Sequence, residues 1–94
     1  MRRVVNGMAY DTKRAILIAH DAYWDGNSFS RKGRNTYLYK TTKGNYFIYR
    51  TTAWQGEINT IEPISKEDAK KWYEELPVQE IPYEMAFGET PEEA

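Results

Sequence analysis

Few side chains in this sequence could carry acid–base or metal chemistry. The one histidine, His20, is followed by Asp21, and Asp25 lies four residues further on. A His-Asp pair suggests a metal phosphohydrolase, but such a site needs further histidine ligands, and two carboxylates leave a hard cation without most of its oxygen ligands. We interpret the neighbouring Glu74 and Glu75 as a solvated helix face. The sequence therefore predicts no catalytic residue, no metal site and no cofactor.

Motifs for nucleotide or acyl chemistry are also missing. The chain has no cysteine, which excludes a disulfide scaffold, a thiol nucleophile and Cys-ligated zinc. It has no P-loop, no Gly-x-Gly-x-x-Gly and no Gly-x-Ser-x-Gly. No apolar run approaches the roughly 18–20 residues that span a bilayer, and the basic N-terminus lacks the apolar stretch of a signal peptide. We therefore expect a non-enzymatic, cytoplasmic binding protein.

Basic and aromatic residues are interleaved in the middle of the sequence, and this pattern favours binding. Of the 94 residues, eight Tyr, three Trp and three Phe are aromatic, which is more than a core of this size needs. A sheet with exposed rings and flanking cations is typical of proteins that hold single-stranded nucleic acid. The opposing interpretation is that the rings form the core and the cations its rim. The candidate contact residues are Arg31, Lys32, Arg34, Tyr37, Tyr39, Lys43 and Tyr49.

Charge divides the chain into a basic first part and an acidic second part. Residues 1–56 contain ten Lys or Arg and three Asp, a net charge of +7, whereas residues 57–94 contain three Lys and eleven Asp or Glu, a net charge of −8. The two parts either face each other and dissolve well or present opposite surfaces to opposite partners. The acidic part supplies a second set of candidate partner-binding residues, namely Glu80, Glu84 and Glu89.

Turn residues predict two hairpins and one further strand. Asn6-Gly7 between short apolar runs predicts a two-residue turn, because both positions of a type I′ turn need positive φ. Residues 36–41 and 46–51 flank a Gly-Asn turn and predict the second hairpin, with Thr41 opposite Tyr46. That register puts Tyr37 and Tyr39 on one face and Tyr49 on the other. Residues 57–64 predict the further strand.

Two helices complete the predicted domain. Apolar residues recur at three- and four-residue spacing from Thr12 to Tyr23 or Trp24, and again after Ser65, a typical N-cap. The result is an α+β domain over residues 1–78, in which a small antiparallel sheet of two hairpins plus one strand packs against two α-helices. Residues 79–94 are predicted to form an acidic, partly flexible C-terminal tail.

Three motifs carry a resemblance to known proteins. They are Val4-Val5-Asn6-Gly7-x-x-Tyr10-Asp11-Thr12-x-x-Ala15, Leu38-Tyr39-Lys40-Thr41-x-x-Gly44-Asn45-Tyr46-Phe47 and Ile61-x-Pro63-Ile64-Ser65-x-Glu67-x-Ala69-x-x-Trp72. This layout, over roughly residues 3–76, resembles a group of small proteins carried by phages and mobile elements of Gram-positive bacteria. Proteins of this kind include anti-CRISPRs, which bind a Cas nuclease and block DNA loading or cleavage. The motifs themselves are structural, so the resemblance implies a scaffold and an inhibitor class but assigns no binding residue.

The leading hypothesis is a phage- or mobile-element-encoded protein that binds and inhibits a Cas nuclease or another defence nuclease in the host bacterial cell. Its acidic part would compete with nucleic acid for a positively charged channel. One alternative is a small nucleic-acid-binding accessory protein that uses the basic-aromatic hairpin. Another is a structural or regulatory homodimer that buries one face of this hairpin.

Overall fold

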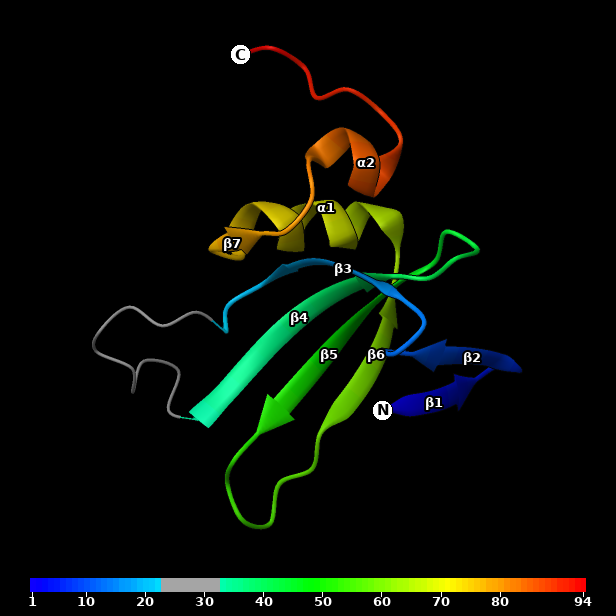
Figure 1. Ribbon diagram of the computed structural model, residues 1–94, viewed down its shortest axis with the longest axis vertical. Coiled ribbons are helices and arrows are strands. Elements are labelled where there is room, and N and C mark those ends of the chain that lie inside the picture. The colour runs from blue at the N-terminus through cyan, green and yellow to red at the C-terminus, as the bar shows by residue number, and fades with distance from the viewer. Residues whose placement is uncertain (23–32) are drawn as a thin grey trace.

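The computed structural model describes residues 1–22 and 33–94 and has an α+β architecture (Figure 1). In this part of the chain, five antiparallel strands form a sheet in the order β6-β5-β4-β3-β7, and β1 and β2 form a separate two-stranded sheet. The strands are β1 (Arg2–Val5), β2 (Met8–Asp11), β3 (Ile16–His20), β4 (Arg34–Lys40), β5 (Tyr46–Thr52), β6 (Thr60–Ile64) and β7 (Val78–Gln79). The helices are α1 (Lys66–Glu75) and α2 (Tyr83–Phe87). No helix in these residues is long and apolar enough to cross a membrane.

The prediction of a helix from Thr12 is wrong, because the described part of that segment forms a turn and strand β3. The Asp11 carboxylate accepts a hydrogen bond from the Lys13 N–H at 2.9 Å, and the Asp11 carbonyl accepts from residues 14 and 15, so the chain reverses before a helix can start. Ile16 and Ile18 in the segment after it are β-branched, which suits a strand. Ile18 is the extra residue of a bulge opposite β4, and it and Ala19 are fully buried. Residues 23 and 24, the predicted helix end, lie outside the described residues.

The hairpin β4–β5 is confirmed, but its register differs by one residue from the prediction. Lys40, not Thr41, lies opposite Tyr46, so the connecting turn has five residues. The turn is closed by the Thr41 N–H, which donates to the Asn45 carbonyl at 2.7 Å, and by the Asn45 N–H, which donates to the Thr41 hydroxyl at 3.0 Å. Gly44 takes the positive φ of 87° that this loop requires. Paired residues share a face, so Tyr37 and Tyr49 now lie together.

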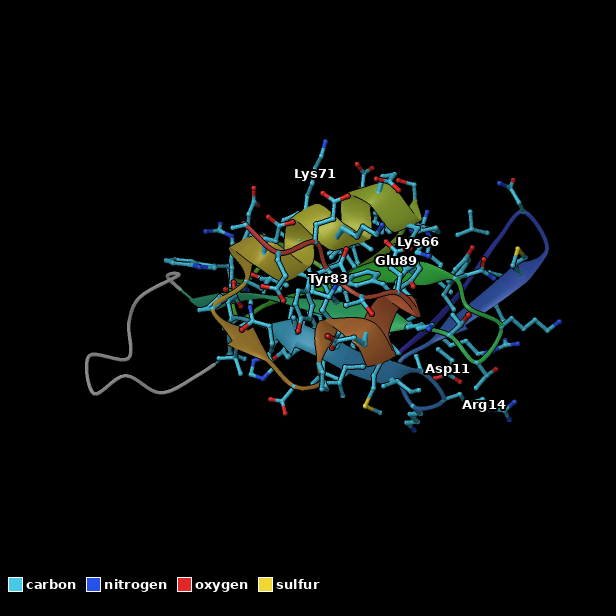
Figure 2. All side chains as sticks on the ribbon, turned by 90° about the horizontal axis from the view of Figure 1, so that it is seen from above. Asp11, Arg14, Lys66, Lys71, Tyr83 and Glu89 are labelled. Atoms are coloured by element: carbon cyan, nitrogen blue, oxygen red, sulfur yellow. The ribbon has the colours of Figure 1, made fainter. Side chains whose placement is uncertain are left out.

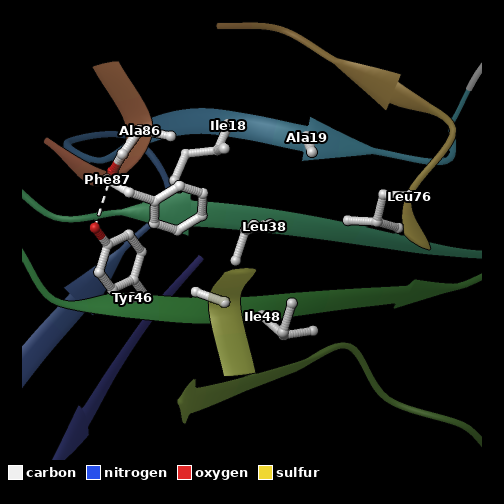
Figure 3. Packing of buried hydrophobic residues seen from close by; sticks show 9 residues of the cluster. Ile18, Ala19, Leu38, Tyr46, Ile48, Leu76, Ala86 and Phe87 are labelled. Atoms are coloured by element: carbon white, nitrogen blue, oxygen red, sulfur yellow. Dashed lines mark hydrogen bonds between the residues drawn. The ribbon is translucent and has the colours of Figure 1, made fainter. Parts of the chain in front are cut away.

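The two helices pack on one face of the sheet, and the main core lies between the helices and the sheet (Figure 3). The α1 N-cap is Ser65, as predicted, whose hydroxyl accepts the Asp68 N–H at 3.1 Å. Ala69 and Leu76 are buried at this interface, whereas Trp72 packs beside them and stays partly exposed. The remaining buried members of this core are Ile18, Ala19, Leu38, Tyr46, Ile48, Ala86 and Phe87.

The segment predicted as an acidic tail contributes to this core through its first half. Strand β7 pairs with β3, and α2 buries Phe87 to 3% exposure. The Tyr46 hydroxyl donates to the Ala86 carbonyl at 2.8 Å, which ties α2 to β5 (Figure 3). The helix ends at Gly88 with a positive φ of 70°. Residues 90–94 are exposed and form no regular element.

A smaller core lies on the opposite face of the sheet. The hairpin β1–β2 places the Tyr10 ring edge-on against the Phe47 ring. Its turn has the predicted positive φ values, 52° at Asn6 and 76° at Gly7. Phe47 and Ile61 are fully buried in this cluster. The Arg3 guanidinium donates to the Ile61 carbonyl at 2.5 Å and joins β1 to β6. The hairpin thus covers part of this face.

The burial of Phe87 gives a test of the role of α2. Phe87→Ala removes a ring that contacts Tyr46, Tyr73 and Tyr83, and we expect a loss of about 3–5 kcal/mol in the free energy of unfolding, measured with urea. Met85→Ala in the same short helix is the control, because Met85 is 67% exposed, and it should change stability by no more than about 0.5 kcal/mol. Equal effects of the two changes would show that α2 is not part of the core.

Candidate functional site

Three tyrosines lie together on the sheet face opposite the helices, and we call Tyr37, Tyr39 and Tyr49 the tyrosine row. The Tyr37 and Tyr49 ring centroids are 5.7 Å apart, and those of Tyr39 and Tyr49 are 6.5 Å apart. All three side chains are half-buried. Alternation along β4 and β5 places them there, since Leu38 and Ile48 between them point into the main core.

Each end of the tyrosine row continues into another ring. At one end, Tyr37 stacks on His20 of the adjacent strand β3, with centroids 6.0 Å apart. At the other end, Tyr39 stacks on Phe47, with centroids 5.2 Å apart and an angle of 7° between the rings. Burial, and then the neighbouring tyrosines, raise the pKa of Tyr39, so this hydroxyl stays protonated at neutral pH. The row is an amphipathic strip of rings and hydroxyl groups suited to stacking and hydrogen bonding.

His20 and Asp21 both have hydrogen-bond partners within the chain. The His20 Nδ1 accepts the Ala22 N–H at 3.1 Å, so its Nε2 carries the proton and donates to the Glu80 carboxylate at 2.6 Å. The Asp21 carboxylate accepts the Thr36 N–H at 2.8 Å and holds the start of β4. Among the described residues no group of three or more His, Cys, Asp or Glu is placed to hold a metal ion.

A basic hollow of about 300 Å³ lies between the hairpin β1–β2, the turn after it and the β4–β5 turn. We define it by its three cations, Arg2, Arg14 and Lys43, which come from these three segments and are all exposed. Asp11 also lines it, and Figure 2 shows Asp11 and Arg14 at the same end of the molecule. Tyr10 forms part of its wall. Only Lys43 of these cations was a candidate from sequence.

Arg34, another basic candidate, is not among the described residues that line the hollow. Arg34 forms a two-point ion pair with Glu57, at 2.5 Å and 3.1 Å, and its guanidinium lies 5.6 Å from the centre of the Trp54 ring. Hydrogen bonds from Arg34 and then from Thr52 lower the pKa of Glu57. The charge of Arg34 is thus balanced within the chain. Arg31 and Lys32 lie outside the described residues.

The acidic candidates are separated from one another. Glu80 is hydrogen-bonded to His20, as described above, whereas Glu89 forms ion pairs with Lys70 and, at 3.3 Å, with Lys66 of α1. In Figure 2 the side chains of Lys66 and Glu89 lie next to each other. Glu84 is exposed in the first turn of α2. The structure therefore uses two of these three carboxylates for contacts within the chain.

The three tyrosines were predicted from the sequence as contact residues, whereas Arg2 and Arg14 were not. The excess of positive charge in the first part of the chain was the only signal that could have pointed to them. Comparison with family models, curated proteins and solved structures found no match to this chain.

The Glu89 ion pairs make a prediction about acid. Hydrogen bonds from Lys70 and then Lys66 lower the pKa of Glu89, so these pairs stabilise the fold at neutral pH and are lost as pH falls through that lowered value. A carboxyl-carbon NMR titration should find Glu89 below the ordinary value for glutamate, and Lys70→Gln should raise it. Lys71→Gln is the control, because Lys71 points away from Glu89 in Figure 2. An unshifted Glu89 in the unsubstituted protein would show that the pairs do not form in solution.

Proposed function

We propose that this protein binds single-stranded nucleic acid on the tyrosine row and catalyses no reaction. The observation that carries the proposal is the β4–β5 register, because it gathers Tyr37, Tyr39 and Tyr49 on one face of the sheet. Stacking on unpaired bases uses rings on a sheet in this way and requires no base-specific motif. The hydroxyl groups add hydrogen bonds, and the Tyr49 hydroxyl already accepts one from the Asn59 side chain at 3.3 Å.

The distribution of charge supports this orientation. The helices carry exposed acids, whereas the basic hollow borders the smaller core, because Tyr10 of that core also lines the hollow. A polyanion is repelled by the acidic side and attracted to the basic one, so the net charge of −1 does not prevent local binding. Two of the acidic candidates, Glu80 and Glu89, are held in contacts within the chain, which weakens the case for them as the main contact.

Replacement of one tyrosine tests the proposed function. Tyr37→Leu keeps an apolar side chain but removes the ring, and we expect binding of a short oligothymidylate to weaken roughly 5- to 150-fold, since a stacked base contributes about 1–3 kcal/mol. Tyr83→Leu is the control, because Tyr83 is half-buried on the helical side. Fluorescence anisotropy at physiological salt measures both, and circular dichroism checks the fold. No binding by the unsubstituted protein, or equal binding by both variants, contradicts the proposal.

A second candidate function is inhibition of a defence nuclease, the function that the resemblance to anti-CRISPR proteins implies. One observation favours it: the helical layer exposes many carboxylates close together in the chain. The exposed acids of this layer are Glu67, Asp68, Glu74, Glu75 and Glu84. Such a surface would compete with nucleic acid for the cationic channel of a Cas nuclease.

Charge reversal on the helices separates the two functions. Combined replacement of Glu74, Glu75 and Glu84 by Lys should slow association with the nuclease, because complementary charges mainly set the association rate. In that case Tyr37→Leu should leave nuclease inhibition unchanged. If the reversed protein inhibits a target nuclease as well as the unsubstituted one, the acidic layer is not the contact.

A further inference from the structure

The basic hollow is the part of the surface that the proposed stacking does not use. Its cations come from positions 2, 14 and 43: the β1–β2 hairpin and its following turn bring Arg2 near Arg14, and tertiary structure adds Lys43. In the part of the chain that the structure describes, none of the three takes part in an ion pair, whereas Arg34, Arg50, Lys66 and Lys70 all do. Their positive charge is therefore available to an external anion.

The hollow is connected to the tyrosine row by a chain of touching rings. Tyr39 of the row stacks on Phe47, the Phe47 ring meets the Tyr10 ring at 5.7 Å, and Tyr10 lines the hollow. Phe47 is fully buried and Tyr10 is 7% exposed, so these contacts lie inside the smaller core, and the hollow and the tyrosine row both border that core. A ligand that occupies both has aromatic groups in one part and negative charge in the adjacent part.

We propose that the basic hollow binds the phosphodiester backbone of the same single strand whose bases stack on the tyrosine row. This inference rests on the proposed function and identifies where the phosphates are held. Arg2 and Arg14 present guanidinium groups, which pair with phosphate oxygens at two points, and Lys43 adds a point charge. An acidic peptide would satisfy the charge but not the adjoining rings, so the nucleic acid fits both features.

Asp11 sets the strength of this site. It lies directly opposite Arg2 in the β1–β2 ladder and lines the hollow, so its carboxylate reduces the attraction for phosphate. The same side chain is needed locally, because its oxygen accepts the Lys13 N–H. Asp11→Asn retains an oxygen acceptor and removes the charge. This change should therefore tighten binding, an effect that damage to the fold does not produce.

The dependence of affinity on salt measures how many phosphates the hollow holds. The probe is a fluorescent oligothymidylate of about 12 nucleotides, within the span of a small binding surface. Each phosphate neutralised on a single strand contributes about −0.7 to the slope of log affinity against log salt. The combined change of Arg2, Arg14 and Lys43 to Gln should therefore make the slope shallower by about 2. Lys43→Gln and Lys71→Gln form a matched pair with equal charge change.

The outcomes separate the two proposals. The phosphate site is supported if the triple variant has a shallower slope of log affinity against log salt than the unsubstituted protein. Lys43→Gln should also have a shallower slope than Lys71→Gln, and Asp11→Asn should bind the probe more tightly. If the unsubstituted protein binds the probe and the triple variant keeps the same slope, the phosphate site is overturned and the stacking function stands. If the unsubstituted protein does not bind the probe at physiological salt, both proposals fall.

Discussion

The register of the β4–β5 hairpin is the constraint on which the two faces of this protein depend. The five-residue turn pairs Lys40 with Tyr46, and every later pair in the hairpin follows from that contact. A shift of one residue would move a whole set of side chains to the other face of the sheet. Phe47 would then enter the helical side and Ile48 would leave it, although both are fully buried where they are. The burial of these two side chains on opposite faces therefore fixes the register and, with it, the tyrosine row.

The elements that depend on a few neighbouring residues, such as a helix cap or a two-residue turn, were predicted correctly. Ser65 caps α1 as expected, and the Asn6-Gly7 turn adopts the predicted positive φ values. The helix predicted at Thr12 fails because apolar residues at three- and four-residue spacing also fit a strand whose bulge brings two successive residues, Ile18 and Ala19, into one core. Pairing with β4 and the bulge at Ile18 stabilise the strand, and neither can be predicted from a short window of sequence.

The same reasoning explains why the end of the chain was assigned to a tail. Its acidic composition is typical of flexible segments, but Phe87 and Ala86 find a place against Tyr46 that only the folded sheet creates. Composition also indicated that the chain has more aromatic residues than its core requires. The grouping of Arg2 and Arg14 with Lys43 could not be predicted, because the hollow forms only where the distant β4–β5 turn meets residues 2–15. Nor could the ion pairs that occupy Arg34 and Glu89.

The proposed function rests on one spatial relation: a strip of rings and a basic hollow that border the same small core. A single strand laid across both has its bases on the rings and its phosphates at the hollow. The opposite, helical side remains acidic and repels the strand, so one orientation is favoured. Under this proposal, the protein would act by occupying or presenting a nucleic acid strand.

Backbone amide NMR during titration with a short oligothymidylate at physiological salt tests this claim most directly. The account predicts shifts at β4 and β5, at the β4–β5 turn and at Arg2 and Arg14, with little change along the exposed face of α1. Shifts confined to α1 and α2, or none at saturating oligonucleotide, would contradict it.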